Sequence, residues 1–348
     1  MTIEFRNVHA SYDADTPILR GIDFTVRDGE FVAFVGTNGA GKSTTMRLIN
    51  GLLKPEMGEV LIDGVPTTEL KTSELAQRVG FLFQNPDSQI CCGTVREELM
   101  FGLNALKVDP DEASRRVEAA ISEFGFNPDD DPFLLNRGTR QLLALASIVA
   151  LRTPVVVLDE PTTGLDFREC VKVMNIIRQL HANGTTVVMV CHDMEIVADF
   201  AERVIVMSNG RVVDQGRTFD VLRNRQTLKA ADLIPPQIVD ISMSLAITHP
   251  DLADQPLGRA NTLNEMETAV ASALGMPDRA SSVPTYSPNA PGAEDEGGIK
   301  KAPDPAARIA AYAAAHAAAR AAAAELDSDQ NGATPSAEPT SPSKGGIR

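Results

Sequence analysis

The sequence predicts an α/β fold with a largely parallel sheet, and two observations carry this prediction. Short apolar segments of strand length alternate with helical stretches such as 42–51 and 167–183. Several of the apolar segments are continuous rather than alternating, which is typical of strands buried on both faces. The predicted strands are 3–8, 31–35, 60–62, 79–83, 155–158, 186–190 and 204–207.

Between residues 86 and 151 the pattern changes to helices only. Segments 94–103 and 111–124 are the clearest of them. We therefore predict a helical subdomain inserted into the sheet domain, with the whole occupying residues 1–233.

Beyond residue 233 the strand-like segments stop. Residues 234–277 contain two short predicted helices, 237–245 after two consecutive prolines and 263–274. Residues 278–348 combine a linker rich in Pro, Ser, Gly and acidic residues with an Ala-rich stretch. Alanine favours helix but offers little apolar surface to bury, so we predict a loosely helical or disordered tail. A helix that docks on a partner is the alternative.

Composition limits the classes of function. The 348 residues are 43% hydrophobic and 23% charged, as in a globular protein with a core. The net charge of -15 would repel a phosphate backbone, and the sequence has no basic cluster, so we expect no nucleic-acid partner. The longest apolar run, 142–151, is too short to cross a bilayer, and the N-terminus lacks a signal-peptide pattern. Both features predict a cytoplasmic protein.

Four cysteines, Cys91, Cys92, Cys170 and Cys191, form neither a C-x-x-C nor a zinc pattern. We predict buried or half-buried free thiols, because cytosolic cysteines are usually reduced and often buried. A redox-reactive Cys91–Cys92 pair is the alternative.

The stretch GTNGAGKS, 36–43, fits the phosphate-binding pattern G-x-x-x-x-G-K-[ST] and lies between a predicted strand and a predicted helix. Glycines let such a loop curl so that successive N–H groups face phosphate oxygens, and the helix N-terminus adds partial positive charge. The lysine would contact the β- and γ-phosphates, and the serine hydroxyl would coordinate Mg²⁺. We therefore predict ATP and Mg²⁺ as ligands. The predicted nucleotide-binding residues here are Gly36, Asn38, Gly39, Ala40, Gly41, Lys42, Ser43 and Thr44.

The strand-like stretch VVVLDEP, 155–161, ends in two adjacent carboxylates. Neighbouring side chains of a strand face opposite ways, so the two acids can take different roles. Asp159 would hold Mg²⁺ through the ion's water shell. Glu160 would act as the general base that polarises the attacking water.

With these motifs in order, the first 233 residues resemble an ABC-transporter ATPase. The resemblance implies a P-loop NTPase fold with a RecA-like core, the helical subdomain at about 86–151 and an antiparallel β element. It also implies roles for four further residues. Tyr12 would stack on adenine, with plain packing as the alternative, and Gln84 would touch the metal and the nucleophilic water. Asp166 would belong to the D-loop, and His192 would contact the γ-phosphate.

Two stretches resemble the energy-coupling factor ATPases within that family: FLFQNPDSQ at 81–89, and IPPQIVDISMSL with TLNEMETAVASAL beyond residue 233. The match then covers about residues 1–275. That group implies uptake of vitamins or Co/Ni ions, with paired ATPases beneath a transmembrane T component that serves a substrate-capturing S component. The implied partners are therefore a second ATPase subunit and the T and S components. The implied location is the cytoplasmic face of the membrane, with docking near 84–102.

Three alternatives remain. The nearest is an ATPase of another ABC importer or exporter. A soluble ABC protein of translation or DNA repair fits less well, because the chain has one P-loop, no heptad run and an acidic charge. A nucleotide-binding regulator without turnover is disfavoured by Glu160 and His192.

One motif departs from the family pattern. FLLNRGTRQLLALAS, 133–147, aligns without a gap to the place of L-S-G-G-Q, which closes over the partner's nucleotide in a head-to-tail dimer. Asn136, Arg137, Gly138 and Thr139 would thus act in trans. Asn caps a helix as well as Ser does, and Arg137 brings a cation near phosphate. Loss of one donor would slow hydrolysis at most about 10²–10³-fold, so we expect a slower partner site that still closes on ATP.

Overall fold

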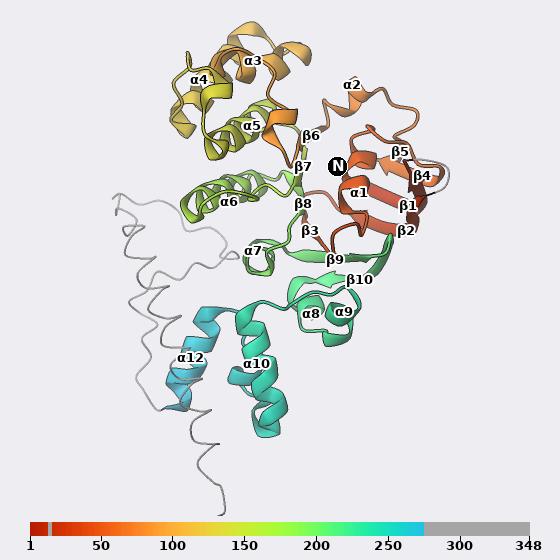
Figure 1. The fold of residues 1–348 in the computed structure, drawn as a ribbon, viewed down its shortest axis with the longest axis vertical. Coiled ribbons are helices and arrows are strands. Elements are labelled where there is room, and N and C mark those ends of the chain that lie inside the picture. Colours follow the sequence, from red (N-terminus) through yellow and green to blue (C-terminus); the bar gives the residue numbers. More distant parts are fainter. Residues whose placement is uncertain (13–15, 275–348) are drawn as a thin grey trace, which may run out of the picture. The chain divides into compact units, whose positions relative to one another are not determined.

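The computed structural model of the chain describes residues 1–12 and 16–274, and the predicted linker and Ala-rich tail lie outside this part. A six-stranded sheet contains both the P-loop strand and the strand of the two acids (Figure 1), and only its β9–β10 pair is antiparallel. The predicted α/β fold is confirmed. In sheet order the strands are β10 (Arg211–Arg217), β9 (Arg203–Ser208), β3 (Phe31–Val35), β8 (Thr186–Val190), β7 (Val155–Asp159) and β6 (Val79–Leu82).

Helices connect these strands and cover the sheet. The helices before the C-terminal extension are α1 (Lys42–Ile49), α2 (Thr72–Leu75), α3 (Val95–Ala105), α4 (Pro110–Phe124), α5 (Arg137–Leu151), α6 (Phe167–Ala182), α7 (Met194–Phe200), α8 (Thr218–Leu222) and α9 (Arg225–Ala230), with 3-10 turns at Pro86–Ser88 and Pro132–Leu134. Helices α3, α4 and α5 pack on one another, in the region predicted as an inserted helical subdomain. Of the helices on the sheet domain, α2, α7, α8 and α9 are absent from the predicted elements.

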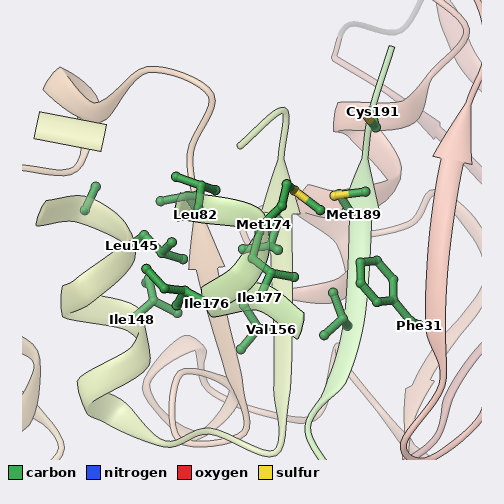
Figure 2. Close-up of a cluster of buried hydrophobic side chains, with 14 of the residues drawn as sticks. Phe31, Leu82, Leu145, Ile148, Val156, Met174, Ile176, Ile177, Met189 and Cys191 are labelled. Atoms are coloured by element: carbon green, nitrogen blue, oxygen red, sulfur yellow. The ribbon is translucent and has the colours of Figure 1, made fainter. Parts of the chain in front are cut away.

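The central strands lie between two apolar cores because their side chains alternate between the faces of the sheet. In β3, Phe31, Ala33 and Val35 enter one core, whereas Val32 and Phe34 enter the other. Every residue of β3, β7 and β8 is buried, as their continuous apolar sequences predict. Figure 2 shows the first core, where side chains of α5 and α6 pack on the sheet. Its labelled residues include Leu82, Leu145, Ile148, Val156, Met174, Ile176, Ile177 and Met189.

The antiparallel β element is a four-stranded sheet in the order β2-β1-β4-β5. Its strands are β1 (Ile3–Ser11), β2 (Pro17–Val26), β4 (Met57–Ile62) and β5 (Val65–Pro66). The predicted strands 3–8 and 60–62 therefore belong to this second sheet and not to the parallel one. Strand β2 is absent from the prediction although Ile22, Phe24 and Val26 alternate with exposed residues. The left-handed Gly21, with φ 72°, interrupts the pattern and hides the strand.

The C-terminal extension, residues 234–274, contains three helices and a 3-10 turn. They are α10 (Gln237–Thr248), the turn Pro250–Leu252, α11 (Pro256–Arg259) and α12 (Leu263–Ala273). Arg223, directly after α8, ties the extension to the domain. Its guanidinium donates to Ser242 Oγ (3.0 Å), Asn261 Oδ1 (3.1 Å) and the carbonyl oxygens of Gly258 (2.6 Å) and Ala260 (3.3 Å). Across residues 1–12 and 16–274, no helix has the length and apolarity to cross a bilayer.

Candidate nucleotide site

The loop between β3 and α1 has the conformation that a phosphate-binding loop requires. Gly36, Gly39 and Gly41 have φ values of 144°, 78° and 101°, a region that favours glycine. A Cβ at Gly36 would also overlap the carbonyl of Met207 in the neighbouring strand β9. Because Gly41 is the N-cap of α1 and has no side chain, the first N–H groups of α1 lack a side-chain cap. These donors suit an anion.

Lys42 lies inside this loop with 5% of its surface exposed. Its Nζ donates to the carbonyl oxygens of Gly36 (2.7 Å) and Thr37 (2.9 Å). Burial lowers the pKa of Lys42, while the charges of Glu160 and Asp159 act in the opposite direction. The ammonium group is therefore held at the loop by weak neutral acceptors, which phosphate oxygens would replace with stronger ones.

Ser43 and Asp159 meet at the end of β7. The Ser43 hydroxyl donates to Asp159 Oδ1 over 3.2 Å, and Asp159 is 6% exposed. Burial raises the pKa of Asp159, and the Ser43 hydrogen bond opposes that shift. A hydroxyl beside a buried carboxylate is a hard oxygen donor set, and a bound cation would compensate the carboxylate for its lost hydration. The pair therefore fits Mg²⁺.

Glu160 is the centre of a hydrogen-bonded group drawn from separate segments. Its Oε2 accepts from Gln84 Nε2 (2.8 Å) and Thr163 Oγ1 (2.9 Å), and its Oε1 lies 2.7 Å from His192 Nε2. The backbone of Glu160 has φ 52°, a strained value for a residue with a side chain. The predicted residues Gln84 and His192 thus both contact the predicted Glu160. Thr163 is an additional member that the motifs do not identify.

Tyr12 lies over the start of α1. Its hydroxyl accepts from Arg47 Nη1 (2.9 Å) and from Thr44 Oγ1 (3.4 Å), and its side chain is 55% exposed. An exposed ring beside the P-loop helix is available for stacking on a base. Arg47, one turn along α1 from Ser43, is a second neighbour that sequence reasoning missed. Its only signal is its spacing from Ser43 on one helix face.

The four signature residues are at the start of α5. Asn136 is the N-cap, and its Oδ1 accepts from the N–H of Thr139 over 2.8 Å, so its amide NH₂ is the group left to donate to a ligand. Arg137 lies against Gly164, and Gly138 lies against the Glu169 carboxylate. Within the part of the chain that the structure describes, no hydrogen bond or ion pair joins these residues to the P-loop. They form a surface separate from this chain's own nucleotide site.

Asp166 begins α6. Its Oδ1 accepts from the N–H of Glu169 (2.8 Å), and its own N–H donates to Glu169 Oε2 (2.9 Å). This reciprocal pair is a capping box, which fixes the start of the helix beside the signature.

The segment around Gln84 is bound to α5 by contacts that the motifs do not reveal. Asp87 Oδ1 lies 2.8 Å from Arg140 Nε, and Gln89 Nε2 donates to the carbonyl of Ala144 (2.9 Å) and to Ser147 Oγ (3.2 Å). These contacts connect the N-P-D-S-Q stretch to the signature helix. They are non-local, so a single sequence offers no signal for them.

All four cysteines are free thiols, as predicted, but Cys91 is exposed and not buried or half-buried as expected. Burial, the Cys91 thiol and the Glu98 carboxylate together raise the pKa of Cys92 to about 12. A thiol with this pKa is protonated at neutral pH, which disfavours the redox-reactive alternative.

Comparisons with known proteins show which proteins this chain resembles in sequence and in fold. The sequence model of the family described as ABC transporter matches residues 19–163. A putative ABC transporter ATP-binding protein of Caldanaerobacter subterraneus subsp. tengcongensis is 40% identical over 249 residues, 71% of this chain. The chain spans only 44% of that relative's length. The energy-coupling factor transporter ATP-binding protein EcfA of Methanothermobacter thermautotrophicus is 40% identical over 243 residues, which are 69% of this chain and 78% of the relative.

Two solved structures are similar in fold. One is cbiO1 of Clostridium perfringens, described as part of the ABC transporter complex cbiONQ, with TM-score 0.58 and 28% identity over 72% of this chain and 96% of the other. The second is a dimeric ATP-binding cassette in a post-hydrolysis state with ADP and phosphate. It has TM-score 0.57 and 29% identity over 62% of this chain and 98% of the other.

Proposed function

Since this chain belongs to the family of ABC transporter ATP-binding proteins, we propose that it is the ATP-hydrolysing subunit of an importer of the energy-coupling factor type. The substrate would be a vitamin or a transition-metal ion. The observation that carries the ATPase assignment is the contact of Glu160 with Gln84, Thr163 and His192 at the edge of the P-loop site.

The chain's own residues divide the work of hydrolysis. Glu160 accepts the proton of the attacking water, because its carboxylate is adjacent to the P-loop site and, among the described residues, forms no ion pair with a lysine or arginine. Gln84 and His192 orient that carboxylate and the water. Lys42 exchanges its two carbonyl acceptors for phosphate oxygens when ATP binds, and the N–H groups of the loop and α1 hold the remaining oxygens.

Ser43, Asp159 and Gln84 would hold Mg²⁺. When bound, the ion neutralises charge on the β- and γ-phosphates. Burial removes water from the Asp159 carboxylate and raises its pKa. A divalent cation would compensate the carboxylate for this lost hydration.

The signature residues would serve a second ATPase subunit in a head-to-tail dimer. Asn136 and Arg137 are exposed at the N-terminus of α5, where they present an amide and a guanidinium to an incoming phosphate. In a heterodimer, this chain's own site keeps its complete set of residues if the partner carries an unaltered signature. The partner's site would then be the slower one.

The energy-coupling factor assignment rests on three features. The N-P-D-S-Q stretch is attached to α5 by the contacts of Asp87 and Gln89. The C-terminal extension is folded and tied to the domain by Arg223. The chain aligns with most of the length of two relatives named EcfA. We propose a peripheral location on the cytoplasmic face of the membrane, with the region 84–102 against a T component that in turn holds an S component.

The test is to express the tagged full-length chain in its own cells and purify it from detergent-solubilised membranes. The proposal expects co-purification of a second ATPase and an integral membrane subunit. Recovery of a lone soluble dimer would contradict it.

Glu160→Gln in the purified complex tests catalysis. We expect ATP hydrolysis to fall at least about 10²-fold, because the general base is lost, while ATP binding remains. Glu123→Gln on the exposed face of α4 is the matched control and should have no effect. Unchanged phosphate release in Glu160→Gln would reject the assigned base.

Comparison with the equivalent substitution in the partner tests whether the two nucleotide sites of the dimer differ in rate. Equal losses of ATP hydrolysis would contradict that difference.

A further inference from the structure

The linker between Gln84 and α3 contains a cluster that the nucleotide site does not use. Cys91, Cys92 and Glu98 each offer one ligand atom, and these three atoms lie within 4.8 Å of one another. The spacing of these residues is no zinc pattern in the sequence, because the third member comes from the first turns of α3. We propose that this cluster binds a divalent cation of the zinc class, through two thiolates and one carboxylate.

The two sulfur atoms already have the separation that such an ion requires. Cys91 Sγ and Cys92 Sγ are 3.9 Å apart. Two thiolates bound to tetrahedral zinc at about 2.3 Å are about 3.8 Å apart along the tetrahedral edge. The pair therefore needs little movement to coordinate one ion.

Glu98 fixes the linker in this geometry. It is 3% exposed, and its Oε2 accepts the backbone N–H groups of Cys91 (2.9 Å) and Cys92 (3.0 Å). A buried carboxylate that holds both cysteine backbones sets the positions of both sulfur atoms. Such outer contacts orient metal ligands in known sites.

Charge and access also suit a cation. The Glu97 side chain lies beside Gly93, next to the cluster, so the surroundings carry further negative charge. Cys91 is exposed and Cys92 is half-buried, so an ion can enter from solvent. A water molecule would fill the fourth position. Because the Cys92 thiol is protonated at neutral pH, the ion must displace its proton, so binding forms two metal–sulfur bonds, breaks two S–H bonds and releases two protons to solvent.

The probe is Co²⁺ added to the full-length protein, followed by displacement with Zn²⁺. Thiolate coordination gives a sulfur-to-cobalt charge-transfer band, which oxygen sites such as Ser43 and Asp159 cannot give. We expect one ion per chain and loss of the band on addition of Zn²⁺. With Zn²⁺ bound, two of the four thiols should become unreactive toward a thiol reagent.

Variants identify the ligands. Cys91→Ser and Cys92→Ser should each weaken Co²⁺ binding at least about 10-fold, and the double variant should lose the band. Glu98→Gln keeps an oxygen acceptor for the two backbone N–H groups but removes the charge, so it should weaken binding without unfolding the linker. Cys170→Ser on α6 is the matched control, because its sulfur lies near the carbonyls of Thr162 and Leu165.

Thermal unfolding of each variant separates ligand loss from misfolding. A double cysteine variant with the wild-type melting temperature and an unchanged cobalt spectrum would overturn the proposal. Absence of a charge-transfer band in the wild-type protein would overturn it equally. Unchanged affinity in Glu98→Gln, with both cysteine variants impaired, would remove the carboxylate from the site.

Discussion

At the scale of single residues, the nucleotide site carries groups that are unfavourable in the protein without ligand. Asp159 is buried with a raised pKa, and Lys42 is buried with a lowered pKa. Glu160 has a left-handed backbone. Each feature costs folding free energy, and each places a group where a phosphate, a metal or a water would be bound. Stability and function therefore oppose one another at these positions.

Asp159→Asn tests that opposition. At pH 7 and without nucleotide, we expect the variant to be more stable than the wild type by about 1 kcal/mol, since it removes a buried charge and keeps an acceptor for Ser43. Addition of Mg²⁺ and ATP should reverse the order, because the variant lacks the carboxylate proposed to hold the metal. Thermal unfolding in both conditions measures this.

The pH dependence of that difference has a defined sign. The pKa of Asp159 is raised above 3.8 in the native state, so the native state holds this proton more tightly than the unfolded chain. The free energy of unfolding that the wild type loses by burying an ionised Asp159 is lost in full above the native pKa. This loss disappears as the pH falls toward 3.8. The advantage of Asp159→Asn should therefore shrink from pH 7 to pH 4. A stability gain of Asp159→Asn that does not change with pH would contradict the role of the buried charge. An equal stability gain for Asp129→Asn, at an exposed residue, would contradict it as well.

At the scale of elements, the start of α5 is constrained by its neighbour α6. Gly138 has no left-handed backbone, yet a Cβ there would overlap the carboxylate of Glu169. Glu169 is itself held by the capping box with Asp166. A side chain at the signature glycine would therefore displace the Glu169 carboxylate from its capping box, a cost on this chain apart from any contact with a nucleotide in trans. Two of the altered signature residues, Asn136 and Arg137, are exposed and free of this constraint.

Gly138→Ala should destabilise the protein by about 1 kcal/mol, because the new methyl group displaces the Glu169 carboxylate and breaks its capping box with Asp166. Because the clash is with Glu169, the double variant Gly138→Ala/Glu169→Ala should recover part of that loss. Chemical denaturation of the four proteins gives the coupling energy, expected at about 0.5–3 kcal/mol. Strict additivity would show that the two residues do not interact. Gly93→Ala, whose Cβ would meet its nearest atom at 3.6 Å, is the mild control.

At the scale of the whole described chain, one arginine connects the ATPase domain to the C-terminal extension. Arg223 reaches four acceptors on three segments of the extension, and burial lowers its pKa. The neighbouring Arg225 makes only long contacts to the same extension, 3.4 Å to Ser244 Oγ and 3.9 Å to Asp240 Oδ1. Arg223 therefore supplies most of the polar attachment, beside the N–H of Gln237, which donates to Glu195 Oε1 over 2.7 Å.

Arg223→Ala should release the extension. Removal of charged hydrogen bonds costs about 1.5–3 kcal/mol, so cleavage by a protease within 234–274 should accelerate at least about 10-fold. Arg223→Lys should fail to restore protection, because a lysine has three donors and no planar fork. Arg225→Ala is the matched control. Equal cleavage of both alanine variants would show that the extension is held by its apolar contacts instead.

The sequence by itself determined the types of the main elements and the chemistry of the site. Continuous apolar runs gave β3, β7 and β8, and the spacing of Gly36, Lys42 and Ser43 gave the phosphate loop. Both signals are local, since strand periodicity and the loop's backbone requirements act over a few residues. The departure of Asn136 and Arg137 from the family pattern was also visible in the sequence alone.

Only the tertiary structure decided how distant segments combine. Strands β1 and β4 pair in a second sheet, and Thr163 donates a hydrogen bond to Glu160. Gly138 lies against the Glu169 carboxylate. Cys91, Cys92 and Glu98 lie close together. These relations depend on strand pairing and helix packing between segments that are often far apart in the sequence. Such contacts are fixed by shape and burial over the whole domain, so no local pattern in a single sequence specifies them.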